Sequence, residues 1–297
     1  MRLGVDLGGT KTEIIALADD GSVLLRRRIA TPQGDYMATL MSIAGLVESA
    51  ENELGQRGSV GIGIPGAESL ATGLIKNANS TCLIGQPLKR DLQALLQREI
   101  RLANDANCFA LSEAVDGSAR DADVVFGIIL GTGVGGGIVI KQQVLTGANA
   151  IAGEWGHNPL PLPNGDDLPL PACYCGRSGC IEAYLSGPAL SADHHRHTGK
   201  KLLSDAIDHL ASAGDKGCTA SLRRYEHRLG RALAGIINIL DPQVIVIGGG
   251  LSKMQGLYQN LPDCCRPYVF SDVFNTKFLP PMHGDSSGVR GAAWLWN

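Results

Sequence analysis

The stretch that decides the fold is "LGVDLGGTKTEIIAL", residues 3–17, in which an apolar strand turns through two glycines into a second strand. Residues 126–140, "FGIILGTGVGGGIVI", have the same form. Glycine permits such a tight turn and lets the backbone approach a ligand closely. Two copies of one strand, turn and strand unit indicate an internal duplication, and therefore a chain built of two related α/β halves.

The segments around these two copies alternate between strand and helix patterns. An Asp20-Gly21 pair between apolar runs predicts a hairpin after the first copy. Apolar residues at steps of three and four predict a helix over about 35–54. Further strands are expected at 59–66, 100–104 and 243–249, and further helices at 88–98, 105–115, 220–240 and 287–296. This alternation predicts the α/β class.

Composition and charge narrow the function classes. The chain has 297 residues, which is near the size at which one core divides into two, and a formal net charge of −3. Such a charge gives no sign of nucleic-acid or anionic-membrane binding, so a small-molecule partner is expected. The uncharged run 124–139 is short and rich in glycine, which favours strand, turn and strand over a membrane span. The opening "MRLGVDLGGT" lacks a secretory pattern, and we expect a cytoplasmic protein.

The glycine turns are candidate phosphate sites. In "DLGGTKT", residues 6–12, the glycines leave backbone N–H groups free for phosphate oxygens, and two such turns could hold a nucleotide tail. A third cluster, "VIVIGGGLS" at 244–252, ends a strand where open α/β sheets bind ligands. None of the three has the G-x-x-x-x-G-K-[ST] spacing. A single such turn would, by itself, favour an ordinary glycine hairpin.

The cysteines of "CYCGRSGC", residues 173–180, form a separate candidate site. A reducing compartment disfavours disulfides, and C-x-C differs from the C-x-x-C of redox pairs. Three thiolates are typical of a structural zinc site with one further ligand, although the spacing alone leaves the choice open. The histidines at 194, 195 and 197 are interpreted instead as a solvated helix end.

The ordered motifs "DLGGTKT", "LANDANC", "ILGTGVGGG", "GEWGH" and "CYCGRSGCIE" resemble the ROK family of bacterial sugar kinases and repressors over nearly the whole chain. The resemblance implies an actin-like (ribonuclease H-like) ATPase fold, with two duplicated α/β lobes and an interlobe cleft for ATP. We expect residues 1–108 plus 287–297 in one lobe and residues 109–286 in the other.

The resemblance also implies roles for single residues. Asp105 is the expected catalytic base, although without the family an N-cap aspartate would be the preferred interpretation. The expected ligands of a structural Zn²⁺ are His157, Cys173, Cys175 and Cys180. The expected sugar contacts are Asn79, Asn104, Asp105, Glu154, His157 and Glu182. The expected contacts of ATP, which brings Mg²⁺, are Asp6, Gly8, Gly9, Thr10, Lys11, Thr12, Gly131, Thr132, Gly133, Gly135, Gly249 and Gly250.

The predicted reaction is transfer of phosphate from ATP to the 6-hydroxyl of a hexose. "GIPG", "KNANST" and the tryptophan of "GEWGH" resemble the fructokinase branch, so fructose is the expected substrate. N-acetyl-D-glucosamine and glucose are the alternatives. A sugar-responsive repressor is the alternative from another class, but it would carry a DNA-binding domain before the first phosphate turn. Family members are often dimers, and we expect a homodimer.

Overall fold

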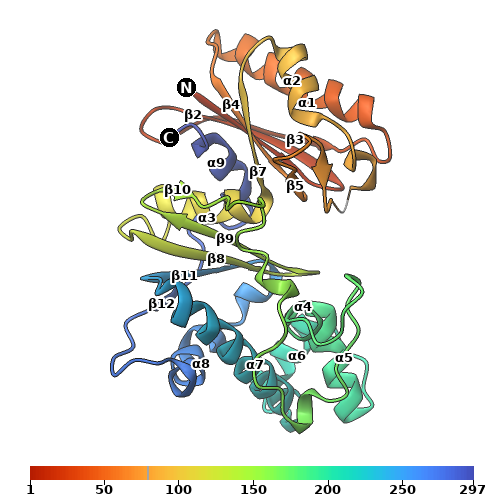
Figure 1. The fold of residues 1–297 in the computed structure, drawn as a ribbon, viewed down its shortest axis with the longest axis vertical. Coiled ribbons are helices and arrows are strands. Elements are labelled where there is room, and N and C mark those ends of the chain that lie inside the picture. The colour runs from red at the N-terminus through yellow and green to blue at the C-terminus, as the bar shows by residue number, and fades with distance from the viewer. Residues whose placement is uncertain (79) are drawn as a thin grey trace. The chain divides into compact units, whose positions relative to one another are not determined.

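The computed structural model describes residues 1–78 and 80–297. Its first five-stranded sheet has the strand order β3-β2-β1-β4-β7 (Figure 1). β1 is antiparallel to β2 and parallel to β4, which in turn is parallel to β7. Gly21, at a φ of +83°, turns the chain between β2 and β3, which confirms the predicted hairpin. The strands are β1 (Arg2–Leu7), β2 (Lys11–Leu17), β3 (Val23–Ala30), β4 (Ser59–Ile64) and β7 (Ile100–Asn104), with a small hairpin of β5 (Ala67–Glu68) and β6 (Ile75–Lys76).

Glycines in this sheet admit the last helix, α9 (Ser287–Trp294). Gly4 on β1 and Gly61 on β4 are register partners. A Cβ at Gly4 would lie 2.1 Å from the carbonyl oxygen of Val289, and one at Gly61 would lie 1.9 Å from that of Ala292. Only glycine allows a helix to pack so closely on the strands. The predicted C-terminal helix is therefore confirmed and lies directly on the first sheet (Figure 1).

The other face of the first sheet carries α1 (Tyr36–Leu54) and α2 (Leu88–Leu96). Strand residues that alternate with Gly4, such as Leu3 and Val5, form one buried core cluster with residues of both helices. The Asp35 carboxylate caps α1 by accepting from the Ala38 N–H at 2.9 Å. α2 ends two residues earlier than predicted because Gln97 adopts a left-handed backbone conformation with a φ of +51°.

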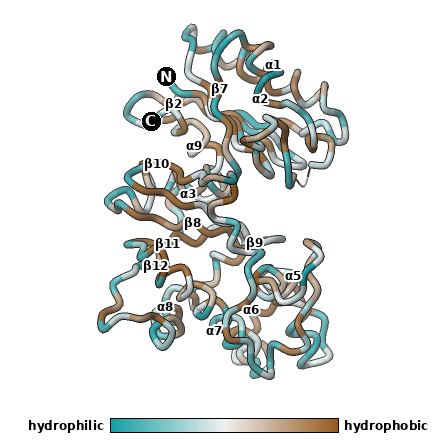
Figure 2. Tube along the Cα trace, viewed as in Figure 1, coloured by the Kyte–Doolittle hydropathy of each residue, from teal (hydrophilic) through white to brown (hydrophobic). Residues whose placement is uncertain are grey.

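The second five-stranded sheet has the order β10-β9-β8-β11-β12. When the strands are numbered within each copy, this is the same order as in the first sheet, so the predicted duplication is confirmed at the level of topology. The predicted strand, turn and strand over 124–139 is also confirmed, and Figure 2 shows hydrophobic colour along β8 and β11. The strands are β8 (Val124–Leu130), β9 (Val134–Ile140), β10 (Gln143–Val144), β11 (Val244–Gly248) and β12 (Lys277–Leu279).

The helices outside the first sheet's layers include α3 (Asp105–Val115), which starts where β7 ends. α7 begins at Lys216, four residues before the predicted start, because Asp215 caps it by accepting from the Cys218 N–H. The remaining α-helices are α4 (Glu182–Leu185), α5 (Gly187–Thr198), α6 (Ser204–Ser212) and α8 (Gln255–Cys265). The short 3-10 helices are η1 (Thr81–Leu83), η2 (Trp155–His157), η3 (Gly165–Asp167), η4 (Gly250–Lys253), η5 (Arg266–Tyr268) and η6 (Gly284–Ser286).

The chain divides into two compact units, which are described separately below. Unit 1 consists of residues 1–121, 137–152 and 282–297, and unit 2 of residues 122–136 and 153–281. Both chain ends therefore belong to unit 1. Among the described residues, no helix has the length and apolar character that a membrane crossing requires.

Candidate functional site

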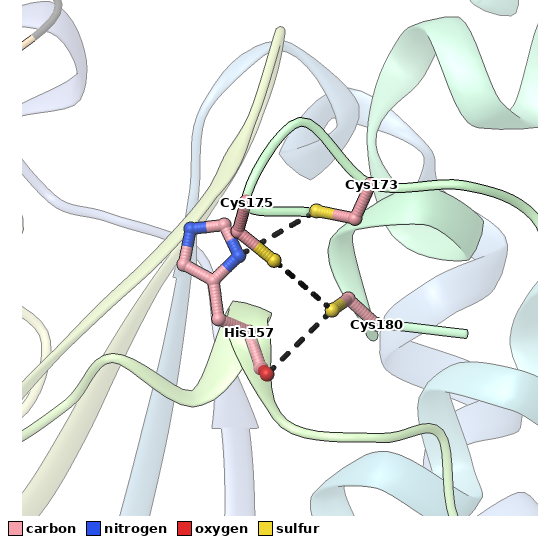
Figure 3. A group of neighbouring side chains, drawn as sticks. All are labelled: His157, Cys173, Cys175 and Cys180. Carbon is pink, nitrogen blue, oxygen red and sulfur yellow. Dashed lines mark hydrogen bonds between the residues drawn. The ribbon is translucent and has the colours of Figure 1, made fainter. Parts of the chain in front are cut away.

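The predicted metal ligands gather in unit 2 (Figure 3). The Cys173 Sγ lies 3.7 Å from the His157 Nδ1, and the Cys175 and Cys180 Sγ atoms lie 3.6 Å apart. All four candidate ligand atoms lie within 4.8 Å of one another. Zinc–sulfur bonds of about 2.3 Å place the ligand atoms of a tetrahedron roughly 3.8 Å apart, whereas a disulfide needs about 2.05 Å. The donor set and its spacing therefore fit one Zn²⁺.

The His157 ring is oriented from its other side by Tyr174. Its Nε2 lies 2.9 Å from the Tyr174 hydroxyl, so a ring whose Nδ1 binds a metal can donate its Nε2–H to that oxygen. With both nitrogens engaged, His157 fits the ligand role predicted for it better than the sugar contact. Hydrogen bonds from Arg177, its backbone N–H first, lower the pKa of the Cys175 thiol, whereas burial raises that of Cys180.

Two glutamates predicted as sugar contacts lie next to this cluster. Residues 173–180, which carry the three cysteines, form the zinc loop. Glu182 follows this loop at the start of α4, and its Oε2 accepts from the Val134 N–H at 2.8 Å, which ties the zinc loop to the second glycine turn. Glu154 precedes η2 and is exposed, without capping that helix by its side chain. Burial raises the pKa of the Tyr174 phenol, and the charge of Glu182 adds to this rise. The glutamates are thus within electrostatic reach of the zinc loop.

The second and third glycine turns lie side by side at one edge of the second sheet. They follow β8 and β11, which are parallel neighbours with Ile129 opposite Gly248. A Cβ at Gly249 would lie 2.4 Å from the Leu130 carbonyl oxygen, so only glycine fits at this junction. Gly131, Thr132 and Gly133 form the other turn, closed by a 3.0 Å bond from the Gly131 N–H to the Gly133 carbonyl. This is the strand edge at which α/β sheets bind ligands.

The first glycine turn belongs to unit 1 and joins β1 to β2. The Gly8 N–H donates to the Lys11 carbonyl at 3.0 Å, and a Cβ at Gly8 would lie 2.7 Å from that oxygen. Thr10 and Lys11 are exposed and available to a ligand. Thr12 is fully buried, and its hydroxyl bonds that of Thr31 at 2.8 Å. The structure therefore places Thr12 beneath the turn, where it stabilises the loop.

Asn104 and Asp105 stand where β7 passes into α3. The helix cap is Asn104, whose Oδ1 accepts from the Ala106 N–H at 2.9 Å and whose amide donates to the Gly66 carbonyl at 3.1 Å. The capping interpretation considered for Asp105 thus applies to its neighbour, and the Asp105 carboxylate is exposed. Burial raises the pKa of the Asp6 carboxyl to about 7, and the charge of Asp105 adds to this rise. The two carboxylates therefore lie close together in unit 1.

A charged row across the first sheet escaped the sequence analysis. Asp6 on β1 is opposite Glu13 on β2, which is opposite Arg28 on β3. Glu13 is buried and paired with both Arg26 and Arg28. Arg28 counters part of the rise in the Asp6 pKa. The Gly21 turn alone could not have predicted this row, because the register of β2 and β3 shifts between Ala16 and Leu17 and so brings Arg28 opposite Glu13.

The histidine interpretation was wrong for one of its three residues. His194 is 1% exposed, and its Nδ1 lies 3.0 Å from the Ser221 hydroxyl. His195 is exposed at the helix end as expected, and His197 bonds the Asp193 carbonyl. The helical step of α5 turns position 194 toward α7, which the sequence pattern around it did not reveal. Asn79, an expected sugar contact, lies outside the described residues.

Comparison with known proteins assigns a family to this arrangement. Residues 2–297 match the family described as ROK. The chain belongs to the ROK family. It is 40% identical, over 99% of both chains, to an N-acetyl-D-glucosamine kinase of Vibrio atlanticus (strain LGP32). A ROK hexokinase from Thermus thermophilus superposes with a TM-score of 0.87 at 31% identity, covering 99% of this chain and 97% of that one.

A second ROK structure, the glucokinase from Streptomyces griseus in complex with glucose and AMPPNP, matches with a TM-score of 0.77 at 27% identity. It covers 98% of this chain and 97% of the glucokinase. These likenesses confirm the predicted actin-like α/β fold and the family resemblance. They do not support the fructokinase branch, because the cited relative of highest identity is an N-acetyl-D-glucosamine kinase.

Proposed function

We propose that this ROK family member transfers the γ-phosphoryl group of ATP to the 6-hydroxyl of N-acetyl-D-glucosamine. The observation that carries the proposal is the 40% identity, along the full length, to an N-acetyl-D-glucosamine kinase. The similar glucokinase was crystallised with glucose and the ATP analogue AMPPNP, which supports a sugar and ATP as the two substrates. Three glycine turns and an exposed aspartate at a strand end agree with phosphoryl transfer.

The expectation of fructose as the substrate rested in part on Trp155, which the structure places in the core of unit 2. Trp155 is 2% exposed, and its ring packs edge-on against Phe126. Its indole N–H donates to the Gly135 carbonyl at 2.9 Å. A side chain so enclosed offers a sugar almost no surface, so phenylalanine in its place would first alter the packing in the core of unit 2. The tryptophan therefore does not by itself argue for fructose.

In the proposed reaction, Asp105 accepts the proton of the 6-hydroxyl as the oxygen attacks the γ-phosphorus. Its exposed carboxylate at the start of α3 suits a base, and Asn104, fixed by two hydrogen bonds, is proposed to orient a neighbouring sugar hydroxyl. Lys11 and the backbone of the glycine turns are proposed to neutralise phosphate charge. Asp6 is proposed to orient water on the Mg²⁺ that ATP brings.

The zinc site is proposed to support sugar binding without entering the chemistry. A Zn²⁺ held by His157 and three cysteines would supply a rigid cross-link, since a four-ligand site has no open position. The residues that it would fix flank two proposed sugar contacts: Glu154 lies three residues before His157, and Glu182 two residues after Cys180. The Glu182 bond to the second glycine turn ties these parts together.

An ATP-coupled assay over four sugars tests this proposal. We expect kcat/KM to be highest for N-acetyl-D-glucosamine, with lower values for glucose, mannose and fructose. Asp105→Asn should keep its fold and lose about 10²- to 10⁴-fold in kcat, the range for loss of a general base. Asp121→Asn, at an exposed site in the same unit, is the matched control and should retain full activity. A higher kcat/KM for fructose would overturn the substrate, and full turnover by Asp105→Asn would overturn the base.

A further inference from the structure

One buried carboxylate of unit 1 has no part in the mechanism described so far. Glu113 lies in the last turn of α3 and is 0% exposed. Its carboxylate accepts from three backbone N–H groups, those of Ser118 at 2.9 Å, Met282 at 2.9 Å and His283 at 3.4 Å. It also accepts from the hydroxyls of Ser118 at 3.2 Å and Ser287 at 2.7 Å. An ionised carboxylate matches such a set, because it accepts at both oxygens and donates at neither.

The donors come from two segments that are far apart in the sequence. Ser118 lies three residues after the end of α3, whereas residues 282–287 re-enter unit 1 and lead into α9. The Met282 and Ser287 bonds span 169 and 174 residues. Gly117 makes room for the carboxylate, since a Cβ there would lie 2.3 Å from Oε2. Glu113 therefore ties the end of α3 to the start of α9.

The segment that Glu113 holds, residues 282–288, lies next to the first glycine turn. Gly288, in the first turn of α9, faces Asp6: a Cβ there would lie 3.2 Å from the Asp6 Oδ2. Further along, α9 packs against α3 at Gly291, where a Cβ would lie 1.6 Å from the Cys108 carbonyl oxygen. α3 itself starts at Asp105. α3 thus carries the proposed base, Asp105, at its first residue. In its last turn it carries Glu113, which holds the turn of α9 that packs against Asp6.

We propose that Glu113 is a positioning residue for phosphoryl transfer, which holds the first turn of α9 against Asp6 through Met282, His283 and Ser287. The proposal rests on the proposed kinase function. Glu113 touches no substrate and acts through α9. When its hydrogen bonds are lost, the first turn of α9 moves away from Asp6. The Asp6 carboxylate then loses the backbone that packs against it beside the first glycine turn. The proposed sugar contacts do not depend on the packing of α9 against Asp6, so the substitution should lower kcat and leave the KM for the sugar almost unchanged.

Glu113→Gln tests the proposal at the carboxylate. The amide keeps the size of the side chain but turns an NH₂ group toward N–H donors, so at least one buried donor loses its acceptor. We expect kcat to fall about tenfold or more while KM for the sugar changes by less than about twofold. Glu226→Gln is the matched control: Glu226 is also buried and accepts from Asn260 at 3.0 Å, but it belongs to unit 2. Its kcat should stay within about twofold of the wild type.

Two serines provide a milder pair, should Glu113→Gln fail to fold. Ser287 and Ser118 both donate a hydroxyl to Glu113, but Ser287 lies on the α9 side and Ser118 on the α3 side. Ser287→Ala should lower kcat about three- to tenfold, and Ser118→Ala less than about twofold. Equal effects of the two substitutions would overturn the proposal, because a merely structural carboxylate has no preference for the α9 side.

Amide hydrogen exchange gives a readout that does not depend on turnover. In Glu113→Gln, residues 282–288 should exchange about tenfold faster or more, whereas they should exchange as in the wild type in Glu226→Gln. Unchanged exchange, or unchanged kcat, in a folded Glu113→Gln protein would overturn the role of Glu113 and leave the proposed function intact. If the wild type prefers another sugar, only the proposed substrate falls, and the variants are compared with that sugar. If no sugar is phosphorylated, the kinase proposal and the role of Glu113 fall together.

Discussion

The segment from His157 to Cys180 is held in two ways that differ in kind. At its ends, the four candidate ligands range from the exposed Cys175 to the buried Cys180. In its middle, Asp167 is 1% exposed and receives 2.7 Å bonds from both Arg228 and Arg231 of α7. The first anchor needs an ion from outside, whereas the second is complete within the chain. We therefore expect that the protein can lose the metal ion without unfolding.

The buried anchor extends beyond one ion pair. Arg228 also bonds Asp193 on α5 at 2.9 Å, and Arg224 bonds the other oxygen of Asp193 at 2.8 Å. The Tyr184 hydroxyl donates to the Asp167 carbonyl at 2.9 Å. These contacts join the loop to α5 and α7. Removing one partner would leave a buried charge without its counter-charge, which costs more than an exposed pair is worth.

Asp167→Asn should have the largest effect on stability. The substitution keeps the size of the side chain but leaves the buried Arg231 without a carboxylate and Arg228 with that of Asp193 alone, so we expect the free energy of unfolding to fall by about 3–5 kcal/mol. Urea denaturation measures it. Asp166→Asn is the matched control, because its exposed side chain lies outside the cluster while its backbone carbonyl still accepts from Arg228. A loss of less than about 1 kcal/mol for Asp167→Asn would show that the buried anchor does not hold the loop.

Cys175→Ser should have a smaller and more local effect. We expect about one equivalent of zinc per wild-type chain, and roughly 10- to 100-fold weaker metal binding in the variant, with reduced sugar affinity. The urea midpoint should move less than in Asp167→Asn, because the buried anchor remains. Metal analysis and titration calorimetry measure the two affinities, with Cys82→Ser as the control outside the cluster. Full zinc occupancy in Cys175→Ser would remove Cys175 from the ligand set.

The same two anchors show what the sequence could and could not predict. The cysteines lie within eight residues of each other, so their spacing suggested a metal site, and the family resemblance added His157, which the structure places beside them. Asp167 and its arginines are 61 and 64 residues apart, and no local pattern joins them. Glu113 and Met282, 169 residues apart, escaped for the same reason. Repeats, turns and helix periods were predictable because they depend on near neighbours, whereas long-range polar pairs depend on the finished packing.

As the pH is lowered, the metal cluster and the Asp167 ion pairs should be lost in a definite order. Of the three changes considered, this one should alter the stability least. Burial favours a raised pKa for Asp167, but hydrogen bonds from the Asn164 N–H and from Arg228 and Arg231 outweigh burial and hold its pKa below the usual range. A carboxyl with a lowered folded pKa stabilises the fold above its unfolded pKa of about 3.9, and this contribution is lost as the pH falls through the folded value.

Zinc is released earlier on the same descent, because protons compete for thiolates whose unperturbed pKa is about 8.5. We therefore expect zinc to leave while the stability difference between wild type and Asp167→Asn is still at its value for neutral pH. That difference should narrow only at more acid pH, where Asp167 takes up a proton. Metal release followed with a coloured chelator, together with urea midpoints at each pH, gives both curves. Zinc that is still bound after the difference has narrowed would contradict the order, and would mean that the metal cluster is the firmer of the two anchors.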